Sequence, residues 1–216
     1  MVDEAMLGFV REYIERRDPL ATTPRYRYPF RQLFGHCFRV CTWAGRICDR
    51  EGGDREVIEP AALFHDVGKC VDVSKAGHAA ASARICGEYL QSTGCDPARA
   101  DRIVAIVGDH IHHCREGDDS PEARIVSDAD LLDEMGAVTV LWDCVGMPEQ
   151  QRCSYNAAYE KICGHYEQYV RDGRKLLTAA GTDFLNERIE SLGQFVRHLE
   201  FELGLSESCA SCETGE

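Results

Sequence analysis

Apolar residues recur every three or four positions along nearly the whole chain, whereas alternating apolar and polar positions of strand length are hard to find. This periodicity is typical of amphipathic helices and predicts an all-α fold. Glycine, proline and charged segments divide the pattern, and Gly68 lies where a helix-ending residue with positive φ is expected. The predicted helices span residues 3–17, 30–51, 54–67, 76–92, 96–113, 122–145, 149–177 and 183–203.

A length of 216 residues suits one sizeable hydrophobic core, so we expect a single-domain helical bundle. In this interpretation residues 1–29 are an N-terminal helix and loop, 30–205 the main helical domain, and 206–216 a flexible tail. The tail contains Cys209 and Cys212 at CxxC spacing. A zinc site needs two further ligands, which no second pair supplies, so a disordered tail is favoured.

The net charge of the chain limits the classes of partner that it is expected to bind. The formal net charge of −13 argues against nucleic-acid or anionic-membrane surfaces, which are bound through clustered Lys and Arg, and it favours small ligands. Arginines nevertheless gather near the N-terminus, among them Arg31 and Arg39. With no bilayer-length apolar run and no secretory signal pattern, we expect a cytoplasmic protein with reduced cysteines. The sequence leaves the oligomeric state open.

Two histidines lie on apolar helix faces, where an unpaired imidazole is costly. His36 shares a stripe with Val40 and Ile47, and His65 ends the apolar run AALF, directly before Asp66. A carboxylate beside such a run is rarely buried unless it is paired or bound to a metal. One buried histidine is more often an ordinary core residue. The His65-Asp66 pair therefore indicates a metal site only together with residues elsewhere in the chain.

Three carboxylates crowd the segment SDADLLDEMGA, which otherwise reads as core. We interpret Asp128 as lying on a solvated helix face. Asp130 and Asp133 are three residues apart on one face, so one can bind a metal while the other orients a ligand or water.

The order H…HD…D, here His36, His65-Asp66 and Asp130, resembles the HD-domain superfamily of metal-dependent phosphohydrolases over roughly residues 30–145. The stretches AALFHDVGK at 61–69 and IVSDADLLDEMGA at 125–137 carry this resemblance. It implies a helical bundle of the HD-domain type with these four residues as metal ligands, and it places Lys69 at the site.

Many members of that family bind a second metal through further histidines, and GHAAASA and DHIHH resemble that extended set. His78 and His110 are our candidates, with His112 or His113 as substitutes. Surface histidines at a helix end are the alternative for the last two. The chain departs from a nucleotide-hydrolysing subgroup at Leu131, where those members have arginine, which weakens a nucleotide preference.

These observations predict a metal-dependent phosphohydrolase for a small anionic, phosphorylated metabolite or a nucleotide. Imidazole and carboxylate ligands suit Mn, Fe, Co, Ni or Zn better than Mg, as one or two ions. Water bound to such an ion is the expected nucleophile. Catalytic roles fall to Asp66, Lys69 and Asp133, and substrate binding to Arg39, Lys69 and Arg31.

Two other functions are compatible with the same residues. A di-iron HD-type oxygenase would use the ligands for oxygen-dependent cleavage, and iron content with oxygen consumption would identify it. A non-catalytic metal-binding regulatory module would keep the metal for structure, with no coordination position left open to water.

Overall fold

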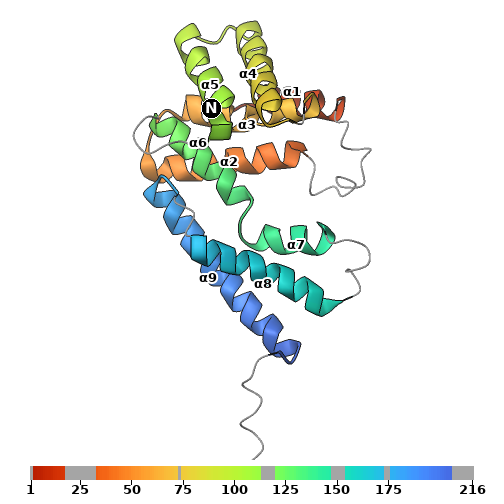
Figure 1. Cartoon of the computed structure of the whole chain (residues 1–216). Coiled ribbons are helices and arrows are strands. Elements are labelled where there is room, and N and C mark those ends of the chain that lie inside the picture. Colours follow the sequence, from red (N-terminus) through yellow and green to blue (C-terminus); the bar gives the residue numbers. More distant parts are fainter. Residues whose placement is uncertain are drawn as a thin grey trace, which may run out of the picture. The chain divides into compact units, whose positions relative to one another are not determined.

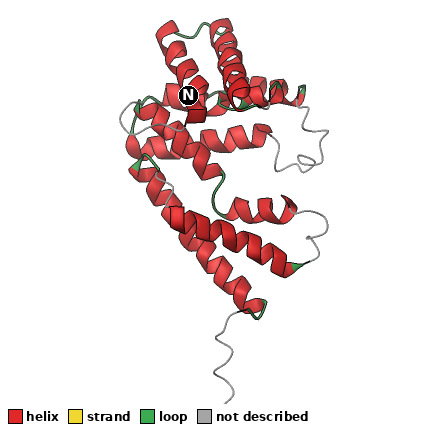
Figure 2. Cartoon of the chain, in the orientation of Figure 1, coloured by secondary structure: helices red, strands yellow, loops and turns green. Residues whose placement is uncertain are grey.

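In a computed structural model, residues 2–17, 33–72, 74–112, 120–146, 154–172 and 176–205 are described. These residues form α-helices and two short 3-10 helices, with no strand among them (Figure 2), so the all-α prediction is confirmed. The elements in chain order are α1 (Glu4–Glu15), α2 (Leu33–Glu51), α3 (Arg55–Phe64), η4 (Val67–Cys70), α4 (Lys75–Ser92), α5 (Pro97–Asp109), η5 (His110–His112), α6 (Pro121–Asp133), α7 (Ala137–Gly146), α8 (Tyr155–Asp172) and α9 (Ala179–Glu202).

The internal contacts of the chain form two compact units. The first comprises Met1–Asp133 with Leu176–Thr182, and the second comprises Glu134–Lys175 with Asp183–Glu216. The boundaries that the sequence suggested, after residues 29 and 205, do not coincide with these units and stay predictions. Among the described helices, none combines the length and the apolar character needed to cross a bilayer.

The first unit is built around α2, which packs against α3 and α6, while α4 packs against α5 (Figure 1). The buried face of α2 includes Val40, Ala44 and Ile47, whose spacing of three and four residues forms one apolar stripe. At the start of α3 the side chain of Asp54 caps the helix by accepting a hydrogen bond from the backbone N–H of Glu56.

Three helices end earlier than the periodicity predicts. α3 ends at Phe64 and is followed by η4, and α5 ends at Asp109 and is followed by η5. The segment predicted as one helix over 122–145 is divided into α6 and α7 near Gly136, whose φ of 103° lies in the left-handed region. Val67 and Met135, next to two of these breaks, are buried. The apolar pattern therefore continues across the breaks, and the sequence does not reveal where the helices end.

Asp128 is buried, so its placement on a solvated helix face was wrong. Its carboxylate accepts hydrogen bonds from the backbone N–H groups of Leu177 (2.9 Å) and Thr178 (2.8 Å) and from the Thr178 hydroxyl (2.6 Å). The Glu51 carboxylate accepts another from the N–H of Ala180, at 2.6 Å. Both carboxylates thus satisfy N–H groups at the start of α9. Burial raises the pKa of Asp128 despite these donors.

In the second unit α7 packs against α8. Asp143 is almost completely buried, and one of its carboxylate oxygens lies 2.6 Å from Nδ1 of His165. The Tyr169 hydroxyl donates to the carbonyl oxygen of Glu134 at 3.0 Å. His165, expected from the sequence to be a structural or surface residue, therefore pairs with a buried carboxylate, and His198 is exposed.

Candidate metal centre

Imidazole and carboxylate side chains converge where several helices of the first unit end or begin. His36 lies in the first turn of α2, His78 in the first turn of α4, and His110 directly follows α5. His65 and Asp66 occupy the turn between α3 and η4, and Asp130 lies in the last turn of α6. Because backbone is irregular or terminal at each of these points, the side chains can point toward one centre.

One half of the cluster joins α2, the α3–η4 turn and α6. Nε2 of His36 lies 3.1 Å from Nε2 of His65. Oδ2 of Asp66 is 3.3 Å from the first nitrogen and 3.6 Å from the second. Oδ1 of Asp130 is 3.4 and 3.5 Å from the same two nitrogens. The structure therefore brings together all four residues that the H…HD…D pattern named.

The other half joins Asp66 to two further histidines. Nε2 of His78 lies 3.2 Å from Nε2 of His110. The second oxygen of Asp66, Oδ1, is 3.3 Å from His78 Nε2 and 3.4 Å from His110 Nε2. Each half has the size of a metal-binding group, and Asp66 belongs to both.

The far nitrogen of each imidazole is held by a hydrogen-bond acceptor. Nδ1 of His65, His78 and His110 faces the backbone carbonyl oxygens of Ala62 (2.7 Å), Ser74 (2.8 Å) and Val107 (2.7 Å), respectively. Nδ1 of His36 lies 2.9 Å from Oδ2 of Asp133. A carbonyl oxygen can only accept, so in these three histidines Nδ1 carries the proton. In the neutral rings Nε2 then presents a lone pair to the cluster, as metal-binding histidines do.

The cluster fits a bound cation. Lone pairs of neutral imidazoles that face each other at 3.1 and 3.2 Å repel, and a positive ion or proton between them removes the repulsion. Asp66 Oδ1 is a buried carboxylate oxygen that accepts no hydrogen bond from the described residues. Buried polar atoms are rarely left in that state. Imidazole nitrogens with carboxylate oxygens are the donor set of transition metals.

Electrostatics in the cluster favour positive charge. Burial alone raises the pKa of Asp66, but attraction to the surrounding imidazoles, that of His65 first, outweighs burial and holds that pKa well below the ordinary value. The pKa of Asp130 is lowered in the same way. For His36, burial lowers the pKa, yet the surrounding carboxylates raise it well above the ordinary value. A proton and a metal ion therefore compete for this place.

Asp133 and Lys69 contact candidate ligands, and Arg39 contacts Asp133. Arg39 donates from Nε and Nη2 to the two oxygens of Asp133, at 2.7 and 2.9 Å, and Asp133 in turn contacts His36. The ammonium of Lys69 contacts Oδ2 of Asp66 while 40% of its side chain stays exposed. These contacts suit positioning roles for Arg39 and Asp133, and the catalytic and substrate-binding assignments stay predictions. Arg31 lies outside the described residues.

Gly68 is required because the backbone there passes close to α4, and not because a turn needs a positive φ. Its φ is not among the positive ones, contrary to the sequence interpretation. A Cβ there would lie 2.2 Å from the carbonyl oxygen of His78 and 2.5 Å from the amide nitrogen of Ser82. Its own N–H donates to Oγ of the buried Ser82 at 2.8 Å. Sequence reasoning missed Ser82, although the run of small residues after His78 is a signal for such close packing.

The remaining candidates lie away from the cluster or outside the described chain. His112 is exposed and contacts the side chain of Asp109 at 2.7 Å. His113, Cys209 and Cys212 lie outside the described residues. Of the histidines at 110–113 that the structure describes, His110 is the one that reaches Asp66.

Comparison with known families agrees with this geometry. Residues 33–135 match the family model of the HD domain, a range that begins at α2 and contains every candidate ligand. These residues form an HD domain. The recognition made from the sequence pattern is thereby confirmed.

Similar proteins include two of bacterial origin that resemble the chain over most of its length. An uncharacterized protein of Bacillus subtilis, YpgQ, is 26% identical over 172 residues, which cover 78% of this chain and 82% of YpgQ. A crystal structure of YpgQ in complex with ADP has a TM-score of 0.59 at 23% identity and covers 91% of this chain and 96% of that one. An HD-superfamily hydrolase from Bacillus thuringiensis has a TM-score of 0.66 at 20% identity and covers 94% and 97%.

Ribonuclease Y of Wolinella succinogenes is 30% identical over 128 residues. The match covers 58% of this chain but 22% of that enzyme. Its likeness therefore concerns one segment of a much longer protein.

Proposed function

We propose that this HD domain is a metal-dependent phosphohydrolase for a small phosphorylated metabolite, with nucleotides as the first class to test. The observation that carries the proposal is the convergence of four imidazole Nε2 atoms on the two oxygens of the buried Asp66. A nucleotide is supported by the ADP bound to the related YpgQ. Leu131, where arginine stands in one nucleotide-hydrolysing subgroup, is an argument for testing other phosphate esters as well.

The residues divide into two ligand groups. His36, His65, Asp66 and Asp130 would hold one ion, and Asp66, His78 and His110 would hold a second. A divalent transition metal held there would supply Lewis-acid polarisation of a phosphoryl oxygen and activation of water for attack on phosphorus.

The protein's own side chains position and neutralise charge. Nε and Nη2 of Arg39 hold the carboxylate of Asp133. This carboxylate accepts a hydrogen bond from Nδ1 of His36 and thereby fixes the orientation of that imidazole. Lys69 is half-exposed beside Asp66, so its ammonium can approach the negative charge on a phosphoryl group entering from solvent. The burial of Asp66 and His65 keeps water away from the inner side of the cluster.

The direct test compares D66A and D130A with the exposed D101A as a matched control. Metal content is measured by elemental analysis, and phosphate release from p-nitrophenyl phosphate, ADP and ATP is measured with Mn²⁺, Fe²⁺, Co²⁺, Ni²⁺ and Zn²⁺. We expect the two cluster variants to lose metal and turnover while keeping helical circular dichroism, and D101A to match the wild type. Unchanged turnover in D66A or D130A would contradict the proposal.

A di-iron oxygenase is the second candidate, because the two ligand groups share Asp66 and so suit a pair of ions. Oxygen consumption by the iron-loaded protein without phosphate release would select it. Stoichiometric metal with neither activity would instead indicate a metal-binding regulatory module.

A further inference from the structure

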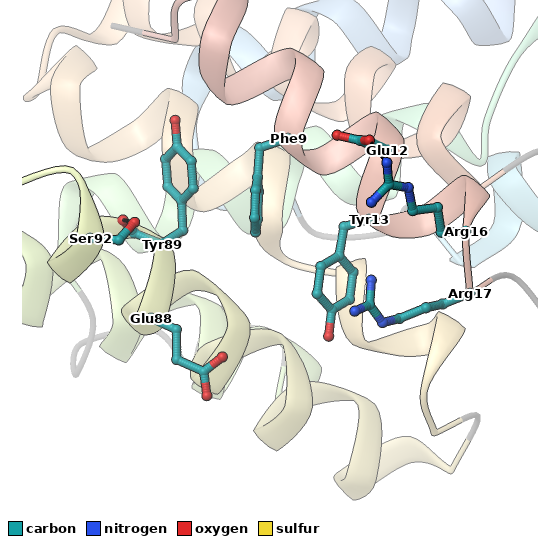
Figure 3. A pocket seen from close by; sticks show the side chains of 8 residues that line it. All are labelled: Phe9, Glu12, Tyr13, Arg16, Arg17, Glu88, Tyr89 and Ser92. Carbon is teal, nitrogen blue, oxygen red and sulfur yellow. Dashed lines mark hydrogen bonds and ion pairs between the residues drawn. The ribbon is translucent and has the colours of Figure 1, made fainter.

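A pocket of about 310 Å³ lies between α1 and α4 in the first unit (Figure 3). That volume is at the lower end of the range found for small-molecule sites. Three aromatic side chains line it, Phe9 and Tyr13 from α1 and Tyr89 from α4. None of the residues that line it belongs to the metal cluster.

The three rings form a row. The centroid of the Phe9 ring lies 4.5 Å from that of Tyr89 and 5.7 Å from that of Tyr13. The rings of Phe9 and Tyr89 also lie 6.1 and 5.4 Å from the ring of Phe64, which is completely buried. The core thus holds the row in place, and it presents a preformed apolar surface for a flat ring.

Among the described residues at the rim of the pocket, Arg17 is the charged side chain without a carboxylate partner. Arg16 pairs with Glu12, and Glu88 pairs with Arg84, so these four charges cancel. The exposed Arg17 lies with its guanidinium carbon 3.9 Å above the centroid of Tyr13 and makes no ion pair with a carboxylate among the described residues. Among the described residues, no carboxylate therefore competes with an anion for its N–H donors beside the aromatic row.

The Tyr89 side of the pocket is separated from the metal cluster along α4. Tyr89 and His78 lie on the same helix, eleven residues apart, which corresponds to about 16 Å along the helix axis. A ligand of the size of one or two fused rings would not span that distance.

We propose that the α1–α4 pocket is a binding site for a planar aromatic molecule that carries an anionic group. The rings of Phe9 and Tyr89 contact the flat part, and Arg17, which lies over the ring of Tyr13, binds the anion. A nucleoside monophosphate and an aromatic carboxylate share this chemistry. The proposal does not rest on the proposed hydrolysis, because no residue that lines the pocket is a candidate metal ligand.

Isothermal titration of the full chain tests this site. EDTA in the buffer removes metal, so that anions cannot bind through an ion at the cluster. The probes are adenosine monophosphate and 2-naphthoate, each compared with its uncharged analogue, adenosine and 2-naphthol. We expect at least one anionic probe to bind, and to bind more tightly than its analogue. Binding of the first identifies a nucleotide and binding of the second an aromatic acid, whereas binding of neither overturns the proposal.

Two variants locate the bound probe. R17Q removes the cation, and we expect it to weaken binding about fivefold, the size of one partly exposed charge contact. S92W places an indole at the rim of the pocket, and we expect it to abolish binding. The matched control is R46Q, because Arg46 is also exposed and stacked on an aromatic ring, that of Trp43, but lies outside the pocket. Equal affinities in wild type, R17Q and S92W, or an equal loss in R46Q, would overturn the assignment.

Discussion

Gly68 controls, as a single residue, how closely the turn that carries His65 and Asp66 approaches α4. A methyl group there would meet backbone atoms of His78 and Ser82, which cannot move aside as a flexible side chain could. G68A should therefore lower the free energy of unfolding by about 2 kcal/mol, the typical cost of overpacking. Urea denaturation measures this change.

G8A is the control for that substitution, because a Cβ at Gly8 in α1 would meet no atom within 4 Å. It should raise the free energy of unfolding by about 0.5 to 1 kcal/mol through helix propensity. A loss of stability in G68A no larger than the change in G8A would refute the close-approach argument.

Asp133 acts on the cluster through His36. D133N keeps the size of the side chain but removes the charge that holds the His36 imidazole and the Arg39 fork. Loss of such a supporting partner typically weakens metal binding about 10- to 100-fold. We expect that range for the dissociation constant of Mn²⁺, measured by competition with a fluorescent chelator. The exposed Asp109 supplies the control D109N, and equal affinities in both variants would show that Asp133 does not support the site.

Among the helices, the start of α9 is held by a buried carboxylate. D128A leaves the N–H groups of Leu177 and Thr178 without their acceptor in a buried place. We expect a loss of about 2 to 3 kcal/mol in the free energy of unfolding, the cost of unsatisfied buried donors. D96A removes the exposed N-cap of α5, which accepts from the N–H of Arg99, and should cost about 1 kcal/mol. Equal losses in the two variants would mean that Asp128 acts as an ordinary cap.

Across the whole molecule, every candidate metal ligand belongs to the first unit. Bound metal should therefore stabilise that unit, by about 2.7 kcal/mol at a Mn²⁺ concentration 100 times the dissociation constant. Cys86 of the first unit is buried, and burial raises the pKa of its thiol, so it is alkylated slowly until the unit opens. Cys163 of the second unit is half-buried, so its alkylation serves as the comparison from that unit.

Pulsed alkylation with iodoacetamide across a urea series, read by mass spectrometry, follows both thiols at once. We expect Mn²⁺ to shift the exposure of Cys86 to higher urea and to shift that of Cys163 less. EDTA should reverse the shift. Equal shifts for both thiols would show that the two units unfold together, and no shift for Cys86 would contradict metal binding in the first unit.

The sequence by itself determined the helical class and the chemically costly residues. A period of three to four residues is a local property, and it survives in α2 as a buried stripe, whereas α3 is buried on nearly every side. His65 and Asp66 at the end of an apolar run are conspicuous because burying such groups requires a partner. Their order with His36 and Asp130 was sufficient to identify the HD domain.

Only the tertiary structure decided what each of these groups contacts. Asp128 and Asp130 look alike in the sequence, yet one binds the N–H groups before α9 and the other faces two imidazoles. The acceptors for His65, His78 and His110 are backbone carbonyls, which every residue possesses and no pattern reveals. The α1–α4 pocket likewise exists because residues about 80 positions apart meet. Such contacts depend on how the helices pack, and periodicity along one helix does not contain that information.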